Sequence, residues 1–121
     1  MQNVLAVAIG GALGALSRYA AGVVCVRWLA APQVYSTFAV NIVGCLAIGV
    51  LAGSSFGQRA LAHTAIGVGF LGGMTTFSTF NLETVRLLES GATLAAMLNV
   101  AASVTLGLAA VGVGLQLGRS L

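Results

Sequence analysis

Four long hydrophobic stretches, separated by short polar segments, dominate the chain. They run over residues 4–29, 35–54, 60–88 and 92–117. Each is long enough to cross the hydrocarbon core of a membrane, which needs about 20 apolar residues per helix. The even alternation of apolar and polar positions that marks a transmembrane β-barrel is missing. The pattern therefore predicts an all-α membrane protein with four transmembrane helices, in a single integral membrane domain over residues 1–121.

The composition supports the membrane class. Of the 121 residues, 59% are hydrophobic and 6% are charged, and a soluble domain of this size leaves too much surface in water to hide so many apolar side chains. The two cysteines and the one histidine lack the spacing of metal ligands. The sequence shows no nucleophile–base pair that would indicate an enzyme. The five arginines are scattered and form no basic patch for nucleic acid.

The flanking arginines are equally divided between the two sides of the membrane and so do not indicate an orientation. An excess of Lys and Arg in cytoplasmic loops normally sets the orientation. Arg27 and Arg86 would lie on the side opposite the N-terminus, and Arg59 and Arg119 on the same side, whereas Arg18 lies inside the first stretch. Two interpretations stay open: the charges are too few to decide, or the chain inserts in both orientations and pairs antiparallel with itself.

Small-residue faces recur on the predicted helices and favour an oligomer. Such faces allow close helix approach in lipid, where hydrophobicity does not drive association. Four short helices hardly enclose a polar pathway by themselves, so we expect a dimer and interpret these spacings as support for it. The GxxxG spacings are Gly10/Gly14, Gly49/Gly53, Gly69/Gly73 and Gly114/Gly118.

The third stretch contains GFLGGMTTFSTF, residues 69–80, a mixture that a lipid-facing helix does not need. Gly72 and Gly73 weaken a helix, and Thr75 or Thr76 is suited to cap a new one, so we expect a third helix broken in mid-membrane. Non-helical backbone at that depth needs protein or a polar cavity around it. A break exposes carbonyls that suit a cation and N–H groups that suit an anion. The residues leave open which ion binds, or whether the break is only a packing kink.

Polar side chains on the other predicted helices share faces. Asn41 lies one turn after Thr37, and Ser103 lies one turn after Asn99. An asparagine amide needs several hydrogen-bond partners, so Asn41 in particular indicates a polar site, with packing as the alternative. The permanent charge of Arg18 must reach water, carbonyls or an anion. It either supplies positive potential for an anion path or extends to the membrane surface.

Aromatic and hydroxyl side chains follow the predicted break. Phe77 and Phe80 are three residues apart and share a helical face. The positive edge of an aromatic ring can meet an anion, although packing is the plain alternative. A hydroxyl face that includes Ser78 and Thr79 runs beside the phenyl face and ends at Glu83, the first acid of the chain.

Three segments resemble the Fluc (CrcB) family of fluoride channels: GGALGALSRY (10–19), STFAVNIVGCLAIG (36–49) and GFLGGMTTFSTFNLET (69–84). The resemblance covers essentially the whole chain. It implies an antiparallel, dual-topology homodimer in the bacterial inner membrane, with two pores and a central sodium ion. It also implies passive export of cytoplasmic fluoride and thereby fluoride resistance. The chain departs from the usual pattern at Ser36, commonly a glycine, and at Asn99, often a tyrosine.

The resemblance further implies roles for residues at the predicted break. Gly72 and Thr75 would give backbone carbonyls to the Na⁺, which the two subunits share across the two-fold axis. Phe77 and Phe80 would line the fluoride route with their ring edges. Asn41 would donate a hydrogen bond to fluoride from its amide.

By the same resemblance, Ser78, Thr79 and Ser103 would lie along a polar fluoride track, and Arg18 and Glu83 match family positions without a clear role. The main alternative is a small four-helix, dual-topology cation or multidrug–proton antiporter. That chemistry needs an acid in the membrane to exchange protons, but the first stretch carries Arg18 and both acids follow the break. A non-transporting assembly subunit is a second alternative. A fluoride-selective channel is the function that we favour.

Overall fold

The computed structural model describes all residues, 1–121, and its regular structure is entirely helical. Four of its helices are long and apolar enough to cross a membrane: Gln2–Trp28, Gln33–Gly53, Ala60–Glu89 and Thr93–Arg119. The prediction of an all-α chain with four membrane-capable helices is therefore confirmed. In chain order, the elements are α1 (Gln2–Val23), η1 (Val24–Trp28), α2 (Gln33–Gly53), α3 (Ala60–Ala62), η2 (His63–Leu71), α4 (Gly72–Met74), α5 (Phe77–Glu89) and α6 (Thr93–Arg119).

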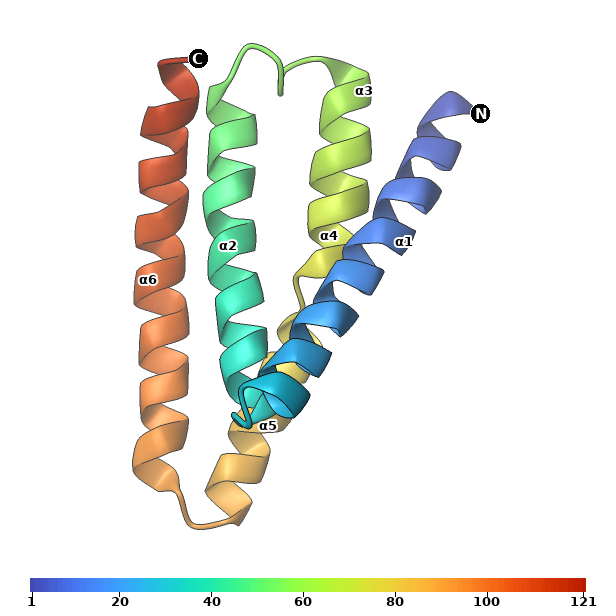
Figure 1. Ribbon diagram of the computed structural model, residues 1–121. Coiled ribbons are helices and arrows are strands. Elements are labelled where there is room, and N and C mark those ends of the chain that lie inside the picture. Colours follow the sequence, from blue (N-terminus) through green and yellow to red (C-terminus); the bar gives the residue numbers. More distant parts are fainter.

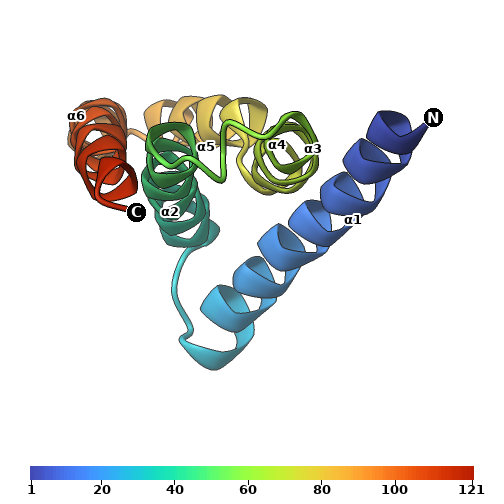
Figure 2. The ribbon, with the colours of Figure 1, turned by 90° about the horizontal axis from the view of Figure 1, so that it is seen from above.

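The four spans run alternately up and down, so both termini lie at the same end of the bundle (Figure 1). Seen from above, α2, α6 and the third span stay close together, whereas α1 runs obliquely away from α2 (Figure 2). The chain direction puts Arg59 and Arg119 toward the end that holds the termini, and Arg27 and Arg86 toward the other end. Two of the four arginines outside the first stretch thus lie toward each end, and Arg18 lies within α1.

Glycines bring α1 against the third span at backbone distance. A methyl group at Gly10 would overlap the carbonyl oxygen of Ala65 in η2, and one at Gly14 would overlap that of Phe70. A methyl group at Gly73 would likewise lie 2.6 Å from the carbonyl oxygen of Gly11. These positions tolerate no side chain, because the facing atoms belong to backbone and cannot move aside.

Close contacts between glycines and facing backbone also join α2 to α6. A methyl group at Gly49 would lie 2.5 Å from the carbonyl oxygen of Val111, and one at Gly114 would overlap that of Leu46. All four GxxxG spacings are therefore used between helices of one chain. Our interpretation of them as support for a dimer was wrong. In lipid, close packing drives helix association, and helices of the same chain meet at a high effective concentration.

Two segments, η1 and η2, are wound as π-helix, which is looser than an α-helix. In η1, the N–H of Leu29 donates to the carbonyl of Val24, five residues earlier, at 3.1 Å. In η2, the N–H of Gly72 bonds likewise to the carbonyl of Gly67. The sequence did not predict either segment. π-Helical turns are frequent at functional sites, and η2 ends four residues before the third span stops being helical.

Candidate functional site

The third span is not helical at Thr75 and Thr76, which have extended backbone with φ −79°, ψ 153° and φ −149°, ψ 117°. Thr75 closes the helix before it, because its Oγ1 donates to the carbonyl of Leu71 at 2.9 Å. Thr76 caps the helix after it, which begins at Phe77. Its Oγ1 accepts the N–H of Thr79 at 3.2 Å. These two threonines define the interruption of the third span.

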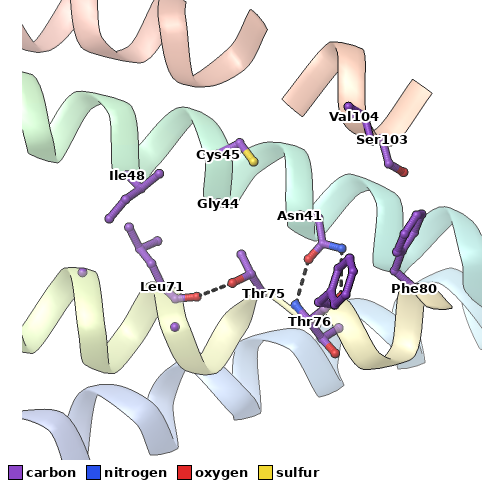
Figure 3. Close-up of a pocket in the computed structure, with 13 residues that line it drawn as sticks. Asn41, Gly44, Cys45, Ile48, Leu71, Thr75, Thr76, Phe80, Ser103 and Val104 are labelled. Carbon is purple, nitrogen blue, oxygen red and sulfur yellow. Dashed lines mark hydrogen bonds between the residues drawn. The ribbon is translucent and has the colours of Figure 1, made fainter. Parts of the chain in front are cut away.

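Asn41 on α2 holds this interruption with two hydrogen bonds (Figure 3). Its Oδ1 accepts the N–H of Thr76 at 2.9 Å, and its Nδ2 donates to the carbonyl of Thr76 at 3.1 Å. A side-chain amide carries the same donor and acceptor groups as a peptide unit. It thus satisfies the extended backbone, as non-helical structure inside a membrane requires. One N–H of the Asn41 amide remains for another acceptor.

These bonds leave two carbonyls of the third span without their helical donors. In a continuous helix, the N–H of Thr76 would bond to Gly72 and that of Thr79 would bond to Thr75. Here the first goes to Asn41 and the second to the Thr76 hydroxyl, and no other bond from either N–H reaches those carbonyls. Gly72 is also exposed at the surface of the subunit.

Gly44 makes room for the interruption one turn further along α2. A methyl group at Gly44 would overlap the Cγ2 methyl of Thr75. Gly44 lies three residues after Asn41, on the same helical face, and is not among the residues to which we assigned a function from the sequence. The three-residue spacing from Asn41 is the signal that could have identified it, because Asn41 bonds to Thr76 and Gly44 faces the neighbouring Thr75.

A cavity of about 410 Å³ opens beside the interruption, between α2, the third span and α6 (Figure 3). The hydroxyl oxygen of Ser103 is buried there without a hydrogen-bond partner. Cys45, one of the two cysteines to which the sequence assigned no function, also lines the cavity. The cavity brings together seven residues that the sequence singled out: Asn41, Gly72, Thr75, Thr76, Phe77, Phe80 and Ser103.

The two phenylalanines pack together at the start of α5. Their ring centroids are 5.9 Å apart, and the ring planes are tilted by 31°. Phe80 is partly buried, whereas Phe77 is 77% exposed. Phe80 thus forms part of the cavity wall inside the subunit, and Phe77 carries the aromatic surface outward.

Ser78 and Thr79 lie beside the cavity rather than in its wall. The Oγ1 of Thr76 donates to that of Thr79 at 3.0 Å and lies 3.3 Å from the Oγ of Ser78. The hydroxyl face expected after the break is therefore a hydrogen-bonded cluster around the N-cap of α5. Ser78 is exposed, and Thr79 is partly buried.

Glu83 and Arg18 lie outside this cavity. The Oε1 of Glu83 accepts a hydrogen bond from the hydroxyl of Thr37 at 2.8 Å, and its Oε2 is buried without a partner. Arg18 lines a second hollow of about 510 Å³ together with Arg27 and Gln33, and its Nε is buried without a partner. The two charged groups that the sequence singled out are thus separate from each other and from the interruption.

Asn99 ties α6 to α5. Its Nδ2 donates to the hydroxyl of Thr84 at 2.9 Å, and that hydroxyl donates to the carbonyl of Phe80 at 2.8 Å. Asn99 does not line the cavity. At the position where the resembling family often has a tyrosine, this chain therefore uses an amide to link two helices.

Four membrane-capable helices and a largely apolar cavity that also holds Asn41, Thr75 and Ser103 define a small multi-pass membrane protein whose polar groups converge within its spans. Polar residues in such a position are typical of ion or substrate pathways. A family model described as "CrcB-like protein, Camphor Resistance (CrcB)" matches residues 5–115. The chain belongs to this family.

The chain is also similar to known bacterial proteins along nearly its whole length. It is 45% identical to "Fluoride-specific ion channel FluC 2" of Rhodococcus jostii (strain RHA1), over 96% of this chain and 98% of that protein. It is 43% identical to "Fluoride-specific ion channel FluC" of Hyphomonas neptunium (strain ATCC 15444), over 100% of this chain and 98% of the relative. The protein of that name from Pseudomonas syringae pv. tomato (strain ATCC BAA-871 / DC3000) is 45% identical, with 98% of each chain covered.

Proposed function

We propose that this chain forms a fluoride-selective channel that lets cytoplasmic fluoride leave the cell passively and so confers fluoride resistance. The observation that carries the proposal is the cavity beside the interrupted third span, in whose wall Asn41, Ser103 and Phe80 meet. It lies in a chain whose relatives are named fluoride-specific ion channels. The membrane potential supplies the driving force, since moving one charge across 100 mV is worth about 2.3 kcal/mol.

The cavity offers donors that suit a small, strongly hydrated anion. An ion that leaves water needs replacement hydrogen bonds, because an unpaired buried charge is very costly. Ser103 contributes a buried hydroxyl without a partner, and Asn41 retains one free amide N–H. Phe80 lines the cavity, and its ring would add a weaker positive surface where its edge meets the ion. Because fluoride concentrates its charge on a smaller radius than chloride, such hydrogen-bond donors stabilise it more strongly.

The same proposal includes a sodium ion held by the backbone carbonyls of Gly72 and Thr75. Both carbonyls lack their helical donors, and unwound carbonyls are the groups that coordinate Na⁺ in membrane transporters. A bound cation would satisfy both oxygens. Thr75 and Thr76 fall in the middle of the 30-residue span Ala60–Glu89, which supports an interruption at mid-membrane depth.

We place this chain in the bacterial inner membrane as an antiparallel, dual-topology homodimer. Two carbonyls are few ligands for a cation, and a two-fold axis at Gly72 would double their number. Gly72 is exposed, and the exposed ring of Phe77 would also face a second copy. The four flanking arginines, Arg18 within α1 left aside, divide equally between the two ends of the bundle, which permits insertion in both orientations.

Fluoride release from liposomes tests the proposed function. Purified protein in vesicles loaded with potassium fluoride should release fluoride when a potassium ionophore removes the charge imbalance, as measured with a fluoride electrode. Vesicles loaded with potassium chloride should retain their anion. Failure to release fluoride, or equal release of chloride, would sink the channel proposal. Anion retention combined with proton-driven export of an organic cation would instead support the antiporter alternative.

A pair of phenylalanine variants tests the assigned route. Phe80→Ile removes the aromatic edge from the cavity wall, and we expect a strong reduction or loss of fluoride efflux with the dimer retained. Phe56→Ile is the matched control, because Phe56 lies in the connection between α2 and α3, packs on Arg59 and does not line the cavity. Equal efflux rates in the two variants would remove Phe80 from the route.

A further inference from the structure

The amide of Asn41 and the carbonyl of Gly72 compete for one donor. The N–H of Thr76 can complete the helix by bonding to Gly72, four residues earlier, or it can bond to the side chain of α2. In the structure it bonds to the Oδ1 of Asn41 at 2.9 Å. The Gly72 carbonyl is free because this side chain has taken its donor.

The position of Asn41 favours its own hydrogen bond with the Thr76 N–H over the bond to the Gly72 carbonyl. Its Nδ2 also donates to the carbonyl of Thr76 at 3.1 Å, so the two sides of one residue's backbone are fixed at once. α2 itself is held by backbone contact with α6 at Gly49 and Gly114, and Gly44 leaves room for the Thr75 methyl. The second helix therefore imposes the interruption on the third.

The two free carbonyls have separate causes. Asn41 frees the carbonyl of Gly72 by accepting the N–H of Thr76. The hydroxyl of Thr76 frees the carbonyl of Thr75 by accepting the N–H of Thr79. The second bond is local to the third span and does not involve α2. A change at Asn41 therefore acts on one carbonyl and leaves the other as it is.

We infer that Asn41 is a positioning residue for the cation site, which it creates by withholding the Thr76 N–H from Gly72. This inference rests on the proposed function, in that the carbonyls of Gly72 and Thr75 are taken to hold sodium. Without Asn41, the Thr76 N–H returns to Gly72, the third span becomes more continuous, and one cation ligand is lost. One side chain thus serves both the wall of the cavity and the sodium site.

Sodium-dependent thermal stability of the purified protein tests this inference without measuring transport. The midpoint of thermal unfolding in detergent is followed while Na⁺ replaces N-methylglucamine at constant ionic strength. For Asn41→Leu, which has a similar volume and no polar atom, we expect the half-maximal Na⁺ concentration to rise at least about tenfold, equivalent to about 1.4 kcal/mol. For Asn41→Asp, which keeps an acceptor oxygen, we expect a value within about threefold of the wild type or lower.

Ser103→Ala is the matched control. Ser103 lines the same cavity, but its hydroxyl makes no hydrogen bond to the interruption. Its loss should slow fluoride release and leave the sodium titration unchanged. Hydrogen exchange gives a second readout, since the N–H groups at Thr75 and Thr76 should change their protection in Asn41→Leu and not in Ser103→Ala. A sodium titration shifted equally in both variants would overturn the positioning role.

The outcomes separate the inference from the proposed channel. An unshifted sodium titration in Asn41→Leu overturns the inference, whatever happens to fluoride release. If Asn41→Leu does not fold, Asn41→Asp decides the matter, because a lost sodium response there would also overturn it. A wild-type protein whose stability ignores Na⁺ would refute the sodium site and the inference together. Wild-type vesicles that retain fluoride would refute the channel, while the sodium titration would still report on Asn41.

Discussion

The close contact between the Thr75 methyl group and the backbone of Gly44 yields the sharpest prediction. Replacing Gly44 with alanine adds one methyl group, which would overlap the Cγ2 of Thr75. Thr75 cannot simply rotate away, because its Oγ1 is bonded to the carbonyl of Leu71 at 2.9 Å. The collision must therefore displace the interrupted backbone from α2 or break that hydrogen bond.

The expected decrease in the free energy of unfolding follows from these two outcomes. Overpacking a filled site by a methyl group destabilises a protein by about 1–3 kcal/mol. A lost hydrogen bond adds about 1 kcal/mol. Gly44→Ala should therefore lower the free energy of unfolding by about 2–4 kcal/mol when both effects operate. Fluoride release should fall strongly, since the displaced Thr76 would separate from Asn41 on the cavity wall.

Thermal unfolding in detergent and the initial rate of fluoride release from liposomes measure the two effects. Gly112→Ala is the matched control, because nothing lies within 4 Å of a methyl group at that position. Alanine in an open helical position stabilises by about 0.5–1 kcal/mol relative to glycine. Gly44→Ala combined with Thr75→Ser should recover stability and rate, since the serine keeps its hydroxyl and its Cβ would lie 3.7 Å from the new methyl.

Two results would refute this reasoning. The first is a Gly44→Ala protein as stable and as active as Gly112→Ala. It would mean that the Thr75 methyl group does not occupy the space beside Gly44. The second is a double variant no better than Gly44→Ala alone, which would place the damage elsewhere on α2. A loss of stability with unchanged fluoride release would show that the interruption tolerates displacement.

Two further predictions concern packing. Gly49→Leu would force a side chain into the backbone of Gly114, so we expect aggregation and loss of helical circular dichroism; a well-folded monomer would instead indicate an interface between copies. Thr37→Val removes the hydroxyl that donates to Glu83 inside the bundle, which should lower the unfolding midpoint through a cost of about 1–3 kcal/mol. Thr105→Val, on an exposed face of α6, is its control, and equal midpoints in the two variants would show that the Glu83 bond contributes nothing.

Local patterns were enough to predict the helices and the residues that cap them. Long apolar stretches specify membrane-spanning helices because no unpaired backbone is tolerated in lipid. The N-cap at Thr76 was also foreseeable, since a threonine ahead of a new helical face is a common cap. Asn41 stood out because an amide inside an apolar stretch must find partners. Each of these expectations depends only on residues close together in the chain.

Partners that lie far apart in the chain were not predictable. Spacing marked Gly49 and Gly114 as parts of close-packing faces, but nothing local showed that the two faces pack together within one chain. Thr37 and Glu83 are 46 residues apart, and their hydrogen bond depends on how α2 meets α5. Similarly, the family resemblance assigned the Asn41 amide to fluoride, whereas in the structure most of that amide is engaged with Thr76.

The glycine contacts have a consequence for how the chain is assembled during synthesis. The first span packs mainly on the third, and the second packs mainly on the fourth, so neighbours in the sequence are not the principal partners. When the first two spans have emerged, neither has its main partner. α1 can pack on the third span only after that span enters the membrane. α2 can pack on α6 only after α6 has followed. Because α2 also carries the amide that holds Thr76, we expect the interruption to reach its final geometry only after α6 has entered the membrane.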